Sequence, residues 1–315
     1  MGKLVFLFPG QGAQQVGMGR ELHAAFPLVR ETYEEAADAS SIDFARLSFE
    51  GPEAELRKTQ NAQPAILVLS VACLRLLRQA GVDAHAAAGH SLGEYSAHVA
   101  AEALRFSAAV GIVRRRGELM YEAGLRRPGT MAAVLGLTAT ELDPVILEAQ
   151  GAGVVVAANL NAPNQVVISG EIAAVERASE LARTAGAKRA VRLEVSGAFH
   201  SPLMASAQEG LEAVLDATAI ENARFPVVAN ATAAPVRASD DIRATLKQQL
   251  TQPVRWEESM RFLAAEGVED AVELGPGAVL KGLMRSNAPG IRVQSVGDPA
   301  GLETAITALL GVGRA

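Results

Sequence analysis

A serine between two glycines constrains the fold of this chain more than any other feature: residues 89–93 read Gly-His-Ser-Leu-Gly. A small apolar run precedes them at 84–88 and a helix-forming stretch follows at 94–101, so the G-x-S-x-G motif stands in a strand–turn–helix context. At a helix start, free N–H groups and the helix dipole favour negative charge. The pattern therefore predicts a nucleophilic Ser91, while a glycine-rich turn with an N-capping serine is the alternative.

Composition limits the class of protein. The 315 residues are 49% hydrophobic and 20% charged, as in a soluble globular enzyme, and the net charge of −6 argues against nucleic acid as a partner. A single cysteine, Cys73, in an apolar helical pattern indicates a buried thiol and a reducing compartment. The sequence shows neither a signal peptide nor the roughly 20 apolar residues of a membrane span, so we expect a cytoplasmic protein without membrane contact.

Apolar strands alternate with helical patterns, which predicts an α/β fold. Residues 4–8 form a short apolar run that is typical of a buried strand in a parallel sheet. A further strand–turn–helix unit is expected at 271–285. Helices are expected at 19–39, 63–79, 92–101 and 106–123.

The pattern changes between residues 127 and 196. Strands and helices there are expected in the order β-α-β-β-α-β, which is the ferredoxin-like split unit. The segments are 131–135, 141–150, 154–159, 165–169, 172–185 and 190–195. We therefore predict a large α/β-hydrolase-like domain with a parallel sheet, residues 1–126 and 197–315, interrupted by a small ferredoxin-like subdomain, residues 127–196.

A nucleophilic serine needs a base, and five histidines are available. His200 is the best candidate by elimination, because it lies in a loop of small residues where the inserted unit returns the chain to the larger domain. A surface loop histidine is the alternative. The histidines set aside, which lie beside the serine, two turns along its helix, or outside any polar motif, are His90, His98, His23 and His85.

The loop that contains Gln11 follows the first expected strand, so it should lie at the carboxyl edge of the sheet, where α/β sites gather. A backbone N–H there, paired with that of Leu92 after the serine, would form an oxyanion hole. A dinucleotide fingerprint would need a glycine where the chain has Gln15. The chain also lacks H-E-x-x-H, a cysteine cluster and an Asp/Asn-rich loop, so no metal site is expected.

Three successive arginines occupy positions 114–116 of an expected helix. On a 3.6-residue period Arg116 falls on the apolar stripe, whereas Arg114 and Arg115 fall off it. A buried arginine without a partner is costly. Arg116 therefore has either an internal carboxylate or an anionic substrate group as its partner, and the sequence leaves both open.

Seven motifs occur in order from residue 8 to residue 277 and together are highly specific. They are Phe-Pro-Gly-Gln-Gly at 8–12, Gly-His-Ser-Leu-Gly-Glu-Tyr at 89–95, Arg-Gly at 116–117, Asn-Ala-Pro-Asn-Gln-Val-Val-Ile-Ser-Gly at 161–170, Gly-Ala-Phe-His-Ser at 197–201, Gln-Pro-Val-Arg-Trp at 252–256 and Glu-Leu-Gly-Pro-Gly at 273–277. In these motifs the chain resembles the malonyl-CoA:acyl carrier protein transacylases and the related acyltransferase domains of polyketide synthases.

The resemblance implies a role for each matching residue. Ser91 would carry the acyl group, His200 would be its base, and Arg116 would bind the malonyl carboxylate. Gln11 and Leu92 would supply the oxyanion N–H groups, and the backbone carbonyl of Gln249 would orient the histidine. Spacing alone leaves three carboxylates open as partners of His200, namely Asp240, Asp241 and Glu273.

The resemblance also implies an activity: ping-pong transfer of malonyl from malonyl-CoA to the phosphopantetheine thiol of acyl carrier protein, through a malonyl-serine and without a cofactor. We expect a monomer, with a carrier-docking patch near Arg189 and Arg192 or near Lys281 and Arg285. Alternatives are a trans-acting polyketide synthase acyltransferase, a serine thioesterase or esterase, and a non-catalytic carrier-binding module. A buried Arg116 argues against the hydrolase, because a simple ester pocket does not use a buried cation.

Overall fold

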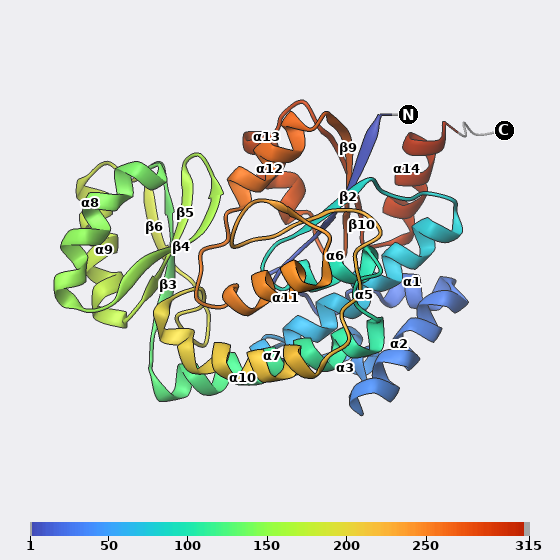
Figure 1. Ribbon diagram of the computed structural model, residues 1–315, viewed down its shortest axis with the longest axis horizontal. Helices are drawn as coiled ribbons and strands as arrows, with labels where there is room; N and C mark the ends of the chain where they lie inside the picture. Colours follow the sequence, from blue (N-terminus) through green and yellow to red (C-terminus); the bar gives the residue numbers. More distant parts are fainter. Residues whose placement is uncertain (1, 312–315) are drawn as a thin grey trace.

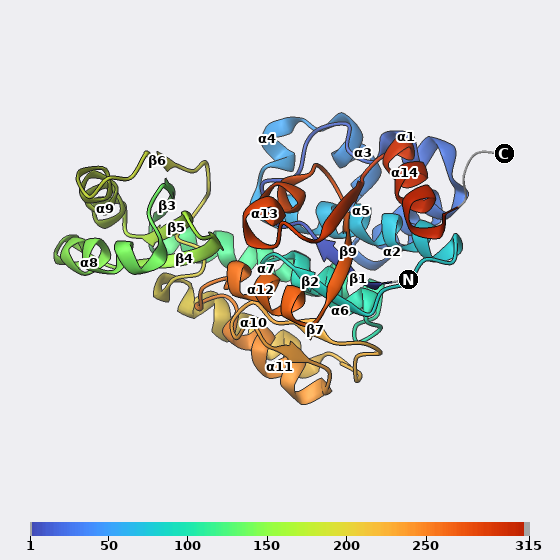
Figure 2. The same ribbon diagram turned by 90° about the horizontal axis from the view of Figure 1, so that it is seen from above.

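The computed structural model describes residues 2–311 and contains two separate β-sheets. Figures 1 and 2 show the smaller sheet, with its two helices, at the left of the molecule and the larger sheet among the other helices at the right. The larger sheet has six strands and is mostly parallel, and the smaller has four antiparallel strands. The predicted α/β architecture with a parallel sheet is confirmed.

The six-stranded sheet has the order β10-β9-β1-β2-β7-β8, and its neighbouring strands are parallel except for the edge pair β7 and β8. Its strand β1 is buried on both faces: Phe6 and Phe8 join one hydrophobic cluster, and Val5 and Leu7 join another. This explains the uninterrupted apolar run at its start. The strands are β1 (Lys3–Phe8), β2 (Ala86–Gly89), β7 (Val227–Val228), β8 (Pro235–Val236), β9 (Val268–Leu274) and β10 (Arg292–Val296).

Helices cover both faces of this sheet, because each face presents apolar side chains that must be removed from water. The helices outside the small sheet unit are α1 (Arg20–Ala25), α2 (Pro27–Ser40), α3 (Phe44–Glu50), α4 (Glu53–Leu56), α5 (Thr59–Gln79), α6 (Gly93–Ala100), α7 (Phe106–Arg126), α10 (Ala205–Ala217), α11 (Ser239–Gln248), α12 (Trp256–Ala265), α13 (Val279–Asn287) and α14 (Pro299–Leu310), with a short 3₁₀ turn at Pro202–Met204.

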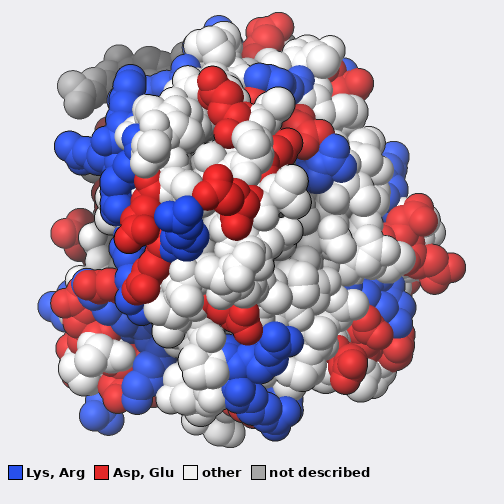
Figure 3. All heavy atoms as spheres, turned by 90° about the vertical axis from the view of Figure 1, so that its left-hand side faces the viewer, with Lys and Arg blue, Asp and Glu red and all other residues white. Residues whose placement is uncertain are grey.

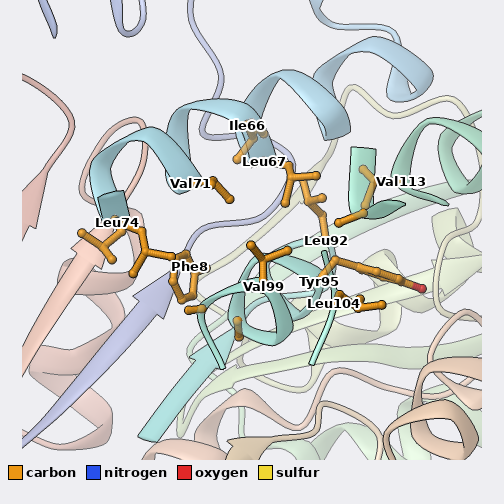
Figure 4. Close-up of a cluster of buried hydrophobic side chains, with 14 of the residues drawn as sticks. Phe8, Ile66, Leu67, Val71, Leu74, Leu92, Tyr95, Val99, Leu104 and Val113 are labelled. Atoms are coloured by element: carbon orange, nitrogen blue, oxygen red, sulfur yellow. The ribbon is translucent and has the colours of Figure 1, made fainter. Parts of the chain in front are cut away.

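Helix α5 is the central helix of the larger core. Figure 4 shows its residues Ile66, Leu67 and Val71 beside Phe8 at the end of β1 and Tyr95 of α6. Among the helices of residues 2–311, only α5 is long and apolar enough to span a membrane, which corrects the expectation that no stretch would be. However, 83% of its apolar window is buried inside the protein. Its apolar character is therefore accounted for by packing.

The four-stranded sheet is formed by the chain between Thr130 and Arg192, which with its helices we call the small sheet unit. Its element order is the predicted β-α-β-β-α-β, its strand order is β4-β5-β3-β6, and it has its own hydrophobic cluster. The elements are β3 (Thr130–Leu135), α8 (Ala139–Ala149), a 3₁₀ turn (Gln150–Ala152), β4 (Val155–Ala162), β5 (Gln165–Gly170), α9 (Ile172–Thr184) and β6 (Arg189–Arg192).

One edge of the small sheet unit is hydrogen-bonded to the rest of the protein. The Leu160 N–H of β4 donates to the Val254 carbonyl at 2.9 Å, and the Val254 N–H donates back to Ala158 at 2.8 Å. The side chain of Asn287 donates to the Asn161 carbonyl at 2.7 Å. These bonds attach β4 to the segment that precedes α12 and to α13.

Several predicted boundaries are wrong for identifiable reasons. The helix expected at 19–39 is two helices, α1 and α2, because Phe26 precedes Pro27 and adopts an extended conformation. The hairpin between β4 and β5 is tighter than predicted, because β4 continues through Ala162. The sequence patterns did not predict the elements between residues 202 and 265. Strands β7 and β8 are too short to show a period, at two residues each, whereas helices α10, α11 and α12, of 13, 10 and 10 residues, were overlooked.

Candidate active site

The turn that carries Ser91 is sharp and strained. Ser91 has a φ of 51°, in the left-handed region that few residues other than glycine adopt. A Cβ on Gly89 would lie 1.9 Å from the carbonyl carbon and oxygen of Gly93, and a Cβ on Gly93 would lie 2.1 Å from the Phe8 carbonyl oxygen. Both motif glycines are therefore required for β2, α6 and β1 to approach this closely, and the turn presents Ser91 at the carboxyl edge of the sheet.

His200 lies directly against Ser91, although 109 residues separate them in the chain: Ser91 Oγ is 2.7 Å from His200 Nε2. The other ring nitrogen, Nδ1, is 2.9 Å from the backbone carbonyl of Gln249 and 3.3 Å from that of Gln252. Because a carbonyl can only accept, Nδ1 must carry the proton, which leaves Nε2 free to accept the Ser91 hydroxyl proton.

The three carboxylates that the sequence left open do not reach the histidine. Glu273 accepts hydrogen bonds from the backbone N–H groups of Leu280 and Lys281 at the start of α13. Asp240 and Asp241 are exposed in the first turn of α11. Within residues 2–311, no carboxylate is hydrogen-bonded to His200.

The environment of His200 favours its neutral form. Burial, and then the positive charge of Arg116, lower its pKa from the ordinary 6.5 to about 3, while the hydrogen bond to the Gln249 carbonyl acts in the opposite direction. The imidazole is therefore a neutral acceptor at physiological pH, which is the state that a general base requires.

Arg116 is 1% exposed and faces inward from α7, as its position on the apolar stripe predicts. Its guanidinium donates to three neutral oxygens: Gln63 Oε1 at 2.6 Å, Gln249 Oε1 at 2.9 Å and Ser91 Oγ at 3.1 Å. Among the described residues it has no carboxylate within ion-pair distance, so the internal ion pair is not the arrangement found. Burial lowers the pKa of Arg116 from its usual value.

The neighbouring arginines point away from the site. Arg114 pairs with Glu118 on the next turn of α7, and Arg115 pairs with Glu118 and Glu122. Gly117 is needed for packing, since a Cβ there would lie 2.5 Å from the Gln60 Cα of α5. This close approach of α7 to α5 lets Gln63 reach Arg116.

Gln11 and Leu92 follow adjacent strands, β1 and β2, whose last residues Phe8 and Gly89 are paired in register. The Gln11 side chain is held against the start of α5, because its Oε1 accepts a hydrogen bond from Thr59 Oγ1 at 2.6 Å. Over the part of the chain that the structure describes, neither the Gln11 N–H nor the Leu92 N–H has a hydrogen-bond acceptor. Two free backbone donors beside a serine are what an oxyanion hole needs.

These groups surround a cavity of about 440 Å³ between the six-stranded sheet and the small sheet unit. That volume lies within the range of small-molecule sites. Gln11, Ser91, Arg116 and His200 line it from the large sheet and its helices. The lining from the small sheet unit and the segment that follows it consists of Met131, Asn159, Asn161, Gln165, Val167, Leu193, Glu194 and Val195.

Sequence reasoning missed two residues that hold the turn. Asn230 bridges it: its Oδ1 accepts from the Ser91 N–H at 2.6 Å, and its Nδ2 donates to the Gly89 carbonyl at 2.7 Å. Asn161 Oδ1 lies 2.8 Å from His90 Nε2, so this ring nitrogen is hydrogen-bonded to the small sheet unit. Asn230 lies in a loop without a periodic or spacing signal, and Asn161, although part of the 161–170 motif, gives no sequence sign of its contact with His90.

No metal centre is evident in the described chain: nowhere in residues 2–311 do three His, Cys, Asp or Glu side chains gather closely enough to hold an ion.

Gly93→Ala should destabilise the protein by about 3 kcal/mol, because its Cβ would overlap the Phe8 carbonyl and force the turn apart. The matched control is Gly111→Ala in α7, where a Cβ meets nothing within 4 Å and alanine should stabilise by about 0.5–1 kcal/mol. Denaturant unfolding measures both. Equal, small effects would contradict the close approach.

The His200 imidazole should stay neutral from about pH 8 to pH 5, because its pKa is displaced far below that of an ordinary histidine. Histidine NMR titration measures this, with His200→Gln to assign the signal and the unfolded protein as reference. The unfolded chain takes up the proton first, so the stability that this residue contributes is present above 6.5 and is lost as pH falls toward about 3. A midpoint near 6.5 in the folded protein would contradict the assigned environment.

Comparison with known proteins agrees with this geometry. A family model for the acyl transferase domain matches residues 5–296. Over 310 residues, covering 98% of each chain, this chain is 48% identical to the malonyl CoA-acyl carrier protein transacylase of Bacillus subtilis (strain 168). Over 307 residues, covering 97% of this chain and 99% of the relative, it is 41% identical to the enzyme of that name from Escherichia coli (strain K12).

Solved structures agree over the same length. A malonyl-transacylase in complex with its holo type II PKS acyl-carrier protein has a TM-score of 0.94 at 41% identity, covering 97% of this chain and 99% of that one. The structure of MCAT from Streptococcus pneumoniae has a TM-score of 0.93 at 40% identity, covering 98% and 100%. The chain therefore belongs to the acyl transferase domain family and is an acyltransferase of the malonyl CoA-acyl carrier protein transacylase group.

Proposed function

We propose that this acyltransferase moves malonyl from malonyl-CoA to the phosphopantetheine thiol of acyl carrier protein by way of a malonyl ester of Ser91. The observation that carries the proposal is the buried Arg116, which lies 3.1 Å from Ser91 Oγ and has neutral partners only. A cation held beside a serine–histidine pair and lining a cavity is suited to an acyl group that ends in a carboxylate.

In the first half-reaction Ser91 Oγ attacks the thioester carbonyl of malonyl-CoA, and His200 Nε2 accepts the hydroxyl proton. The carbonyl oxygen becomes an oxyanion, which the N–H groups of Gln11 and Leu92 stabilise. Each such donor is worth on the order of 10²–10³ in rate. The carbon–sulfur bond then breaks, and the CoA thiolate leaves as a thiol with the proton from His200.

In the second half-reaction the thiol of the carrier protein attacks the malonyl ester. His200 accepts the thiol proton and returns it to Ser91 Oγ as the ester bond breaks, so the enzyme is regenerated. The Gln249 carbonyl holds the imidazole in the required tautomer throughout. The proposed exchange of one thioester for another needs no cofactor and no metal ion.

Arg116 supplies the choice of acyl group in this proposal. With a malonyl group its donors can form a bidentate pair with the carboxylate. With an acetyl group the guanidinium would stay buried without an anion, so the site would discriminate against the donor that lacks the carboxylate. The same argument disfavours a simple serine esterase. It also disfavours a non-catalytic carrier-binding module, because in such a module Ser91 would be incidental and a buried cation beside it would have no explanation.

We also propose that the six-stranded part is an α/β-hydrolase-like domain, residues 1–126 and 197–315, and that residues 127–196 form a ferredoxin-like subdomain. The separate hydrophobic cluster of the small sheet unit and its β-α-β-β-α-β order support this division. The cavity between the two parts would then be a domain-interface site, a common place for ligands.

Acyl carrier protein is the proposed partner, because the relatives are named for it and one structural neighbour is bound to such a protein. The pathway that the enzyme supplies is fatty acid synthesis, with polyketide synthesis as the alternative, because this neighbour is bound to a type II PKS acyl-carrier protein. We propose a cytoplasmic monomer that binds neither nucleic acid nor membrane. On the face in Figure 3, basic and acidic residues are interspersed, so charge alone does not favour one docking patch there.

Brief incubation of the protein with malonyl-CoA should add one malonyl group, seen by intact mass spectrometry, and holo carrier protein should remove it. Ser91→Ala should abolish the adduct, whereas Ser107→Ala, an exposed serine outside this cavity, should retain it. Release of free malonate without carrier protein would favour the hydrolase, and an adduct that survives Ser91→Ala would contradict the proposed nucleophile.

A further inference from the structure

The mechanism above does not use a fully buried carboxyl group that lies beside the site. Glu94 lies in the first turn of α6, and none of its surface is exposed. Its Oε2 accepts a hydrogen bond from Gln249 Nε2 at 2.6 Å and from the Asn230 N–H at 3.1 Å. Its Oε1 has no hydrogen-bond partner among the described residues, and His98 Nε2 is 3.9 Å from it. A buried carboxylate is costly unless a nearby positive charge compensates it.

Glu94 is connected to the buried cation Arg116 through one amide. Gln249 is 1% exposed, and its side chain lies between the two charges. Its Oε1 accepts from Arg116 at 2.9 Å, while its Nε2 donates both to Glu94 and, at 2.9 Å, to the Ser91 carbonyl. Glu94 and Arg116 are thus held apart by an amide that is hydrogen-bonded to both.

Only one orientation of this amide satisfies both neighbours. A carboxylate only accepts hydrogen bonds and a guanidinium only donates them. Glu94 therefore forces Nε2 toward itself, and Oε1 must then face Arg116. A rotated amide would place two N–H donors against the guanidinium and an oxygen against the carboxylate. Through the amide of Gln249, the buried carboxylate of Glu94 therefore determines that Arg116 faces an oxygen and not an N–H group.

This separation has a functional consequence. A carboxylate in direct contact with Arg116 would accept hydrogen bonds from the guanidinium. It would then compete with an anionic substrate for the same N–H donors. A carboxylate one amide away still lowers the cost of burying the cation, because Coulomb interactions extend over several ångströms in a weakly polar interior. The Arg116 donors nearest Ser91 and Gln63 meanwhile face only neutral oxygens, which a substrate carboxylate can replace.

We propose that Glu94 and the side chain of Gln249 form a counter-charge relay that keeps Arg116 buried, oriented and free to bind the carboxylate of the acyl donor. Both are positioning residues for acyl-donor selectivity, since they act through Arg116. For Gln249 this role is additional to that of its backbone carbonyl, which faces His200. The inference rests on the proposed malonyl transfer.

The test exchanges the two side chains. In the double variant Glu94→Gln/Gln249→Glu the number of charges and the hydrogen bond between positions 94 and 249 are kept, but the carboxylate comes into direct contact with Arg116. The single variant Glu94→Gln removes the charge while keeping an acceptor for Gln249, so Arg116 remains free of a carboxylate. The matched control is Gln248→Glu, which adds the same charge at an exposed neighbouring position of α11.

Single-turnover acylation of Ser91 by malonyl-CoA and by acetyl-CoA, followed by intact mass, gives the selectivity ratio for each protein. The exchange should lower the malonyl-to-acetyl ratio by about 100-fold, because the internal carboxylate competes with the substrate. Glu94→Gln should lower the ratio by about tenfold, the step that 1.4 kcal/mol represents, because Arg116 loses its counter-charge and the Gln249 amide loses the group that orients it. The control Gln248→Glu should keep the parental ratio within about threefold.

A parental ratio in the exchanged protein, or in Glu94→Gln, would overturn the relay. Gln249→Met tests it without adding charge: it keeps side-chain length and the backbone carbonyl but removes the amide that orients Arg116, so the ratio should fall about tenfold. An unchanged ratio there would also overturn it. The unmodified protein is measured beside each variant. If it shows no preference for malonyl-CoA, the proposed transfer itself is refuted. If both it and the double variant prefer malonyl-CoA, only the relay is refuted.

Discussion

The site depends on one buried positive charge that has no negative charge in contact with it among residues 2–311. Arg116 lies on the inward face of α7, and its three hydrogen-bond acceptors are neutral. Such a group is costly to bury, so the surrounding structure must hold it in place. The same charge contributes to the low pKa of His200 and donates to Ser91 Oγ, which links the proposed selectivity of the site to its proposed chemistry.

The strained turn at Ser91 is the second constraint, and it makes the arrangement rigid. The Gly89 and Gly93 backbones leave no room for a side chain, and Asn230 bonds both sides of the turn. His200, which also has a left-handed φ of 56°, is held by backbone carbonyls. The proposed nucleophile and base are thus positioned largely by main-chain atoms, as expected where functional geometry is stored as local strain.

The sequence predicted those parts of the molecule that have a local signal. The G-x-S-x-G motif indicated the turn, the apolar run at β1 indicated a strand buried on both faces, and the helical period placed Arg116 inward. Contacts between distant segments had no such signal. That His200 Nδ1 meets a carbonyl could be inferred only by resemblance, and the amide of Gln249 between Arg116 and Glu94 depends on α6, α7 and α11 being packed together. Helix α5 shows that a strong local signal can also mislead: its hydropathy resembles that of a membrane span, but burial in the core accounts for it.

The most direct measurement of the central claim is the acylation of Ser91 in Arg116→Ala, compared with Arg115→Ala, whose side chain pairs with glutamates on the outer face of α7. Comparing the rate constants for malonyl-CoA and acetyl-CoA distinguishes a loss of acyl-donor selectivity, which affects one donor, from a folding defect, which affects both. The account predicts that Arg116→Ala lowers the rate constant for malonyl-CoA by about 10³-fold without a comparable loss for acetyl-CoA, while Arg115→Ala changes neither. An equal loss with both donors would show that Arg116 serves the fold, and would contradict its proposed role as the carboxylate-binding group.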